Sequence, residues 1–190
     1  GANYGIYTFL FYKNSAYTYA VEPISACLQY IIEGLDNKKN IAFINKIASN
    51  KNGETVLKTP IEKGIPVYGK SSVVNNFNNY QNNICKTFIV DKYFEEIDSK
   101  KHKIIFIKID VEGHELEVLQ GAAKIISNKK SILLVEIEKR HNKKYIEVFK
   151  YLIDIGFSVY NLKNGNLQPV AAEEVQNIMQ VANNFVFKNY

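Results

Sequence analysis

Short apolar runs alternate along the chain with segments in which apolar residues recur every three or four positions. Residues 104–109 (IIFIKI) and 132–137 (ILLVEI) are nearly continuous apolar runs, which predicts strands buried on both faces of a sheet. Between them, Leu116, Leu119 and Ile126 mark one face of a helix. This order predicts parallel strands joined by a right-handed crossover.

The same alternation continues on both sides of this unit. Strands are expected at residues 17–21, 41–48, 54–58, 157–162 and 184–188, and helices at residues 24–35, 92–97, 143–155 and 173–181. The pattern predicts a single α/β domain over residues 1–190, with a doubly wound, mainly parallel sheet. In such sheets ligands bind beyond the carboxyl ends of the strands, so the residues just after each strand are the candidates for chemistry.

Residues 59–83 differ from the rest of the chain. They are rich in asparagine, contain prolines and glycines, and show no clean period. We expect a long loop, because this composition is typical of irregular connections. Loops of this length inside a compact domain are commonly lids or binding loops. We therefore expect residues 59–83 to determine which acceptor the protein binds.

Composition and charge exclude several classes of protein. The formal net charge is +5 with a pI of about 9.0, but the lysines are dispersed, so no nucleic-acid partner is expected. No apolar run reaches the roughly 18 residues of a membrane span, and no signal peptide is visible. The two cysteines, Cys27 and Cys85, fit neither a metal motif nor a disulfide scaffold, which favours a reducing cytoplasm.

A glycine turn opens the chain. Gly1, Asn3 and Gly5 precede a plausible helix, and glycines there allow the backbone to approach a ligand closely. Glu22 ends the next predicted strand, where a carboxylate can accept hydrogen bonds from the two hydroxyls of a ribose. Taken alone, Glu22 is equally consistent with a solvent-facing acid in a loop. The combination of glycine turn, strand and terminal acid favours a ligand that contains adenosine.

The densest ionisable cluster surrounds Gly113, directly after the strand at residues 104–109. Asp110, Glu112 and His114 are its candidates for catalysis, and Glu115 follows them. Crowded acids at a partly buried strand end raise one another's pKa values, which suits a general base. Structural alternatives exist for each residue, since Asp110 and Glu115 also suit the start of a helix and His114 a surface position.

The same strand ends also offer carboxylates that could hold a metal ion. Asp110 and Glu136 are expected to converge there, and two carboxylates suit a hard cation such as Mg²⁺. No clear third ligand is evident in the sequence. We therefore expect no metal.

Several of these segments, in order along the chain, are similar to those of a known family. Residues 104–122 (IIFIKIDVEGHELEVLQGA) closely resemble the hallmark segment of FkbM-type methyltransferases. Residues 1–8 (GANYGIYT) resemble the family's cofactor loop, and residues 20–23 (AVEP) the segment with its ribose-binding acid. Residues 48–53 (ASNKNG) resemble the turn after its third strand.

The resemblance implies a class I methyltransferase fold, Rossmann-like, whose seven-stranded sheet has its last strand antiparallel. It also implies S-adenosylmethionine as the cofactor and, as the working reaction, O-methylation of a hydroxyl on a sugar, glycan or small natural product. In this family the first strand lies just before the glycine loop. We therefore expect the domain in residues 1–190 to be truncated at its N-terminus.

The resemblance also implies a role for each candidate residue. Gly1, Asn3 and Gly5 would pack against the methionyl and ribose parts of the cofactor, and Glu22 would hold the ribose hydroxyls. Ser49 would lie near the adenine. Asp110 would lie beside the methyl donor and the substrate. Glu112, with His114 as the alternative, would be the base that takes a proton from the attacking hydroxyl.

Three other functions share parts of this pattern. An NAD-dependent oxidoreductase has the same alternating architecture, but its GxGxxG motif is missing here. A truncated or degenerate domain would bind a nucleotide or a partner without turnover. A nucleic-acid methyltransferase would suit the basic charge, and its affinity would fall steeply with salt.

Overall fold

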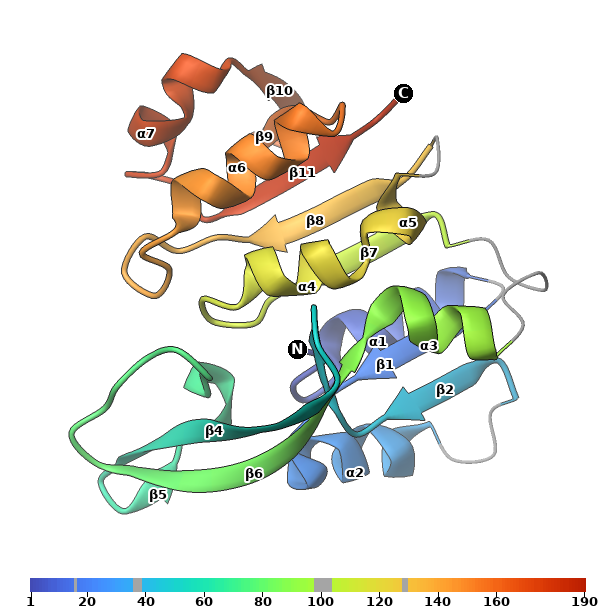
Figure 1. Cartoon of the computed structure of the whole chain (residues 1–190), viewed down its shortest axis with the longest axis vertical. Coiled ribbons are helices and arrows are strands. Elements are labelled where there is room, and N and C mark those ends of the chain that lie inside the picture. Colours follow the sequence, from blue (N-terminus) through green and yellow to red (C-terminus); the bar gives the residue numbers. More distant parts are fainter. Residues whose placement is uncertain (16, 36–38, 98–103, 128–129) are drawn as a thin grey trace.

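The computed structural model describes residues 1–15, 17–35, 39–97, 104–127 and 130–190, and shows a mixed α/β fold with several sheets (Figure 1). Within these residues, no helix is long and apolar enough to cross a membrane.

The N-terminal part of the fold is a parallel two-stranded sheet with helices packed on it. Helix α1 (Ile6–Asn14) precedes β1 (Thr18–Val21), and α2 (Ser25–Gly34) connects β1 to β2 (Ile41–Ile44). Apolar side chains from these strands and helices form one buried cluster, which includes Ala20, Ile31, Leu35 and Ile41.

The largest sheet has five strands in the order β10-β9-β11-β8-β7. Its strands are β7 (Phe106–Ile109), β8 (Ile132–Glu136), β9 (Ser158–Lys163), β10 (Asn166–Val170) and β11 (Asn184–Lys188). The β7–β8 pair is parallel. The last strand, β11, lies antiparallel between β8 and β9, as the family resemblance implies.

Helices pack against this sheet to form the main core. These are α4 (Glu115–Gly121), α5 (Ala123–Ile126), α6 (Tyr145–Asp154) and α7 (Val175–Ile178). The ring of Phe149 on α6 packs edge-on against Phe185 of β11, with ring centroids 4.9 Å apart. Leu119, Leu133 and Leu152 are fully buried in the same cluster. This core fixes β7 and β8, whose carboxyl ends carry the candidate site.

The third sheet is a long hairpin that projects away from the other two (Figure 1). It contains β3 (Ile47–Ser49), β4 (Gly53–Glu62), β5 (Ile65–Pro66) and β6 (Tyr80–Ile89), and leads into α3 (Val90–Glu96). Strand β6 pairs antiparallel with β4 and parallel with β3.

The sequence predicts one doubly wound sheet, and this is the main point at which the structure differs from the prediction. The described strands form three sheets of mixed direction, and β1 and β7 each pair along one edge with a described strand. The strand expected at residues 41–48 is two strands. Asn45 lies at the break, where its amide donates to the carbonyl oxygens of Glu22 and Pro23 at 2.9 and 3.0 Å.

The long loop expected at residues 59–83 is also wrong over much of its length, since β4, β5 and β6 all enter it. The asparagines conceal the strand pattern because much of this hairpin lies in solvent, so polar residues are tolerated on both of its faces. Asn83, for example, donates to Thr59 Oγ1 across the hairpin at 3.1 Å. Strand β10 was not predicted either, because four of its five residues are exposed.

We predict that Leu152→Ala lowers the free energy of unfolding by roughly 2–5 kcal/mol, because the side chain is fully buried between α6 and the five-stranded sheet. Lys150→Ala on the exposed face of α6 is the matched control and should change it by less than about 0.5 kcal/mol. Denaturant titration measures both. Equal, small effects would show that α6 is not packed as described.

Candidate functional site

The glycine loop and Glu22 lie together, in the arrangement that the sequence suggests. The buried Glu22 carboxylate accepts the backbone N–H of Asn3 at 2.7 Å through Oε2 and that of Ile24 at 3.0 Å through Oε1. The loop backbone is also anchored to β1, since Ala2 N–H donates to the Val21 carbonyl at 3.0 Å. Asn3 and Gly5 have φ of 49° and 88°, and the left-handed conformation at both positions gives the loop its tight turn.

The same loop touches the carboxyl end of β7. Gly1 packs so closely on Asp110 that a Cβ added at Gly1 would lie 1.8 Å from the Asp110 carbonyl oxygen. Any side chain at this position would force the two segments apart. The glycine loop, Glu22 and Asp110 therefore form one continuous region at the ends of β1 and β7.

A buried lysine links the ends of β7 and β8. Lys108 Nζ lies 3.2 Å from Asp110 Oδ2 and 3.6 Å from Glu136 Oε2, and its side chain is 6% exposed. Burial, followed by the negative charge of Asp110, raises the pKa of Glu136 to about 6. Asp110 and Glu136 thus converge as the sequence predicts, with Lys108 between them.

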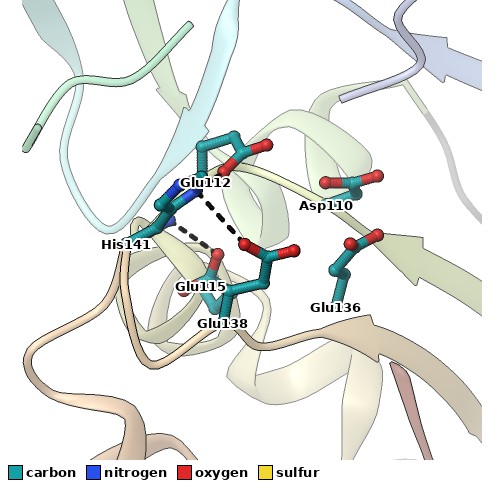
Figure 2. Close-up of a pocket in the computed structure, with 7 residues that line it drawn as sticks. Asp110, Glu112, Glu115, Glu136, Glu138 and His141 are labelled. Atoms are coloured by element: carbon teal, nitrogen blue, oxygen red, sulfur yellow. Dashed lines mark hydrogen bonds and ion pairs between the residues drawn. The ribbon is translucent and has the colours of Figure 1, made fainter. Parts of the chain in front are cut away.

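A second set of side chains lies beside this pair (Figure 2). His141, on the loop after β8, directs Nδ1 at the Glu112 carboxylate in a direct contact, and the same nitrogen is 3.6 Å from Glu138 Oε2. Burial raises the pKa of Glu112, while the hydrogen bond and charge of His141 oppose that rise. Glu138 is also bonded to Arg140, which holds the pKa of its carboxyl below the ordinary range.

Glu115 joins the loop that contains Glu112 to the loop that contains His141. Its carboxylate, almost fully buried, accepts the Gly113 backbone N–H at 2.8 Å and the Asn142 side-chain amide at 2.5 Å. Gly113 allows the close approach, because a Cβ there would lie 2.5 Å from the His141 carbonyl oxygen. Glu115 therefore holds the site together, while burial raises the pKa of its own carboxyl.

The segment between β5 and β6, residues 67–79, also reaches the site, and together with the strands around it is called the hairpin region. Ser72 Oγ donates to the Glu112 carbonyl oxygen at 2.6 Å, and the Asn75 amide donates to the same oxygen at 3.3 Å. Val74 packs on Gly113, since a Cβ at that glycine would lie 2.7 Å from Val74 Cγ2. Residues 72–75 thus cover the turn that contains Glu112.

Ser49 and His114 pair with each other. Ser49 Oγ, at the end of β3, lies 3.1 Å from His114 Nε2. His114 Nδ1 is buried and 3.6 Å from Glu117 Oε2, beyond hydrogen-bond distance. Burial lowers the pKa of His114. The imidazole that contacts Glu112 therefore belongs to His141, whereas His114 faces Ser49.

Sequence reasoning missed three contributors to this site. The sequence predicts Lys108 only as part of a strand, although its place two residues before Asp110 puts both side chains on the same side of the chain at the end of β7. Glu138 and His141 follow a buried strand, and that was the available signal. Their contact with Glu112 depends on how the two loops fold, which spacing along the chain does not reveal.

The comparisons with known proteins identify the family of the chain. The family model described as "Methyltransferase FkbM domain" matches residues 1–159, and the chain belongs to this family. No curated protein gives a significant match.

The solved structures include a similar one, the crystal structure of Methyltransferase FkbM from Methylobacillus flagellatus KT at 2.20 Å resolution. Its TM-score is 0.60 at 16% sequence identity, and the match covers 98% of this chain and 41% of that one. The likeness shows a shared fold. The chain spans about two fifths of that protein's length.

We predict that Glu136→Gln stabilises the protein more at pH 7 than at pH 4.5. Because the pKa of Glu136 is raised from 4.5 to about 6, the folded chain holds this proton more tightly than the unfolded chain. Stability is therefore lost as pH rises through this window, and glutamine removes the loss. After allowance for solvent screening, the difference in melting temperature between Glu136→Gln and wild type should be roughly 2–4 °C more favourable to the variant at pH 7 than at pH 4.5.

The exposed Glu54→Gln is the control for this comparison and should give parallel wild-type and variant curves. A Glu136→Gln curve that also runs parallel to wild type would contradict the raised pKa. Thermal unfolding followed by circular dichroism at several pH values measures both.

Proposed function

We propose that this protein is an S-adenosylmethionine-dependent methyltransferase that methylates a hydroxyl group on a sugar, glycan or small natural product. The observation that carries the proposal is the continuous region formed by the glycine loop, Glu22 and Asp110 at the ends of β1 and β7. Membership of the FkbM methyltransferase family supports it.

The residues at this region fit the cofactor. Glu22 accepts two backbone N–H groups, and its two oxygens keep lone pairs for ribose hydroxyls. The close packing of Gly1 on Asp110 brings the loop backbone to the end of β7, where a ligand would approach. Ser49, at the end of β3, would lie toward the adenine, with its hydroxyl oriented by His114.

The carboxylate pocket supplies the acid–base chemistry. S-adenosylmethionine would provide a methyl group on a sulfonium, which is already a good leaving group. Glu112 would accept the proton from the acceptor hydroxyl, and burial, which raises the pKa of its carboxyl, makes it a better base. Asp110, held by Lys108, would orient the acceptor beside the glycine loop.

Acceptor choice is proposed to depend on the hairpin region. Residues 72–75 lie on the turn that contains Glu112, and Val74 is 47% exposed beside it. An exposed apolar side chain next to the proposed base is suited to contact an acceptor. This supports the expectation that residues 59–83 determine acceptor specificity.

Two further expectations are kept as proposals. Among the described strands, β1 and β7 each pair along one edge only. One more strand at their other edges would join the two sheets into the doubly wound sheet of a class I methyltransferase. Cys27 and Cys85 are both free and buried, which supports a reducing cytoplasm.

We predict that S-adenosylhomocysteine binds this protein and that Glu22→Gln weakens binding by roughly 10–100-fold. The reason is that the amide loses the charge and half of the acceptors that would hold the ribose, at about 1.5–3 kcal/mol for a charged hydrogen bond. Isothermal titration calorimetry measures the affinity, with NAD as the control ligand and Glu54→Gln as the control variant.

Tight binding of NAD would exclude the methyltransferase in favour of an oxidoreductase. Failure of a folded protein to bind S-adenosylhomocysteine would favour the alternative of a degenerate nucleotide-binding domain without catalytic activity. Circular dichroism of Glu22→Gln separates lost affinity from lost folding, since Glu22 also holds the glycine loop.

We predict that Glu112→Gln lowers the rate of methyl transfer by roughly 10²–10⁴-fold, because the amide cannot accept the hydroxyl proton. Transfer of a labelled methyl group to a panel of sugars, glycans and small hydroxylated natural products measures the rate. Affinity for S-adenosylhomocysteine should stay within a few-fold of wild type. An unchanged rate would show that the base is another residue.

A further inference from the structure

Positive charge is unevenly distributed over the carboxylate pocket. Asp110 and Glu136 share the buried Lys108. Glu112 and Glu138 face no buried lysine or arginine among the residues that the structure describes. Arg140, which bonds the same Glu138 oxygen that lies 3.6 Å from His141 Nδ1, has a side chain that is 71% exposed. The group between these two carboxylates is the imidazole of His141.

These three side chains have the arrangement of a cation site. One ligand atom each from Glu112, Glu138 and His141 lies within 4.8 Å of the others. Two ligands on opposite sides of a divalent cation are separated by about twice the metal–ligand distance, or roughly 4–5 Å for distances of 2.0–2.6 Å. In Figure 2 the Glu112, Glu138 and His141 side chains converge on one another from the two loops.

The ligand atoms are held in place by contacts of their own backbones. Ser72 and Asn75 bond the Glu112 carbonyl oxygen, and the N–H groups of His141 and Asn142 donate to the Glu138 carbonyl oxygen at 3.0 and 2.9 Å. The ligand side chains are 14–20% exposed. The site is therefore partly desolvated but still open to solvent, as an exchangeable ion requires.

We infer that Glu112, Glu138 and His141 bind a divalent cation. Two carboxylate oxygens and one imidazole nitrogen form a mixed ligand set that suits Mn²⁺ and related first-row ions, with water at the remaining positions. The cation would place positive charge between two carboxylates that lack a buried basic partner. This ligand set differs from the pair considered in the sequence, Asp110 and Glu136, and contains neither of those residues.

The inference goes beyond the proposed function, since cation binding requires neither cofactor nor acceptor. Its relevance to an acceptor hydroxyl rests on the proposed function, which gives Glu112 the role of base. With the cation bound through one carboxylate oxygen of Glu112, the other oxygen would remain to accept the proton of the acceptor hydroxyl. The two ideas are therefore tested separately.

The test is a titration of the metal-free protein with Mn²⁺ at pH 7.5, in which electron paramagnetic resonance measures the free ion and calorimetry the affinity. We expect one site per chain. His141→Ala and Glu138→Gln should each weaken binding by about 10-fold or more, whereas the exposed Glu54→Gln and Glu173→Gln should bind as wild type does. His141→Gln, which retains a polar side chain, guards against misfolding, and circular dichroism confirms that each variant is folded.

The absence of stoichiometric Mn²⁺ binding by the folded wild-type protein would overturn the inference. So would equal affinity in wild type, His141→Ala and Glu138→Gln, because the ion would then lie elsewhere. Affinity for S-adenosylhomocysteine, measured on the same samples, reports on the proposed function independently.

Discussion

The buried carboxylate of Glu115 is the contact on which the candidate site depends. It accepts the Gly113 backbone N–H from one loop and the Asn142 amide from the other, so the turn after β7 and the turn after β8 are held by one side chain. A buried acid is costly unless its oxygens are hydrogen-bonded, and here both oxygens are. Because this anchor is fixed, Glu112 and His141 meet across the two loops. Gly113 completes the constraint, since no side chain fits between it and the His141 carbonyl oxygen.

The elements that the sequence predicted correctly are those buried by the core. β8 and α6 were predicted because burial on one or both faces dictates their apolar spacing. β7 is a strand as predicted, but the expectation that it is buried on both faces is wrong, since Phe106 is exposed and only Ile109 of its four residues is buried. The sequence did not predict the full hairpin of β4 and β6, because strands that extend into solvent need no apolar face. The split of the expected single sheet has a different cause: it depends on which strand edges meet, and local pattern does not report on that.

Within the site, strand order predicted one half, and proximity along the chain failed to predict the other. The glycine loop, Glu22 and Asp110 come together because parallel strands end at one edge, which strand order implies. His114 follows Glu112 closely in sequence, yet the start of α4 turns its imidazole toward Ser49. The partner of Glu112 is His141, from a loop that only the folded chain brings near. The same folding divides the carboxylates into a pair balanced by Lys108 and a pair that faces an imidazole.

The way in which residues 72–75 approach the site separates acceptor choice from chemistry. Ser72 and Asn75 bond the backbone carbonyl of Glu112, not its carboxylate, so the carboxylate remains free to contact His141. Val74 touches Gly113 and otherwise faces solvent. Side chains at this covering segment can therefore change without altering the charges in the pocket, as long as the bonds to the carbonyl persist. The hairpin region projects from the fold and bonds the site through one backbone oxygen, that of Glu112. Its side chains can therefore change which acceptor is bound while the residues at the strand ends stay in place.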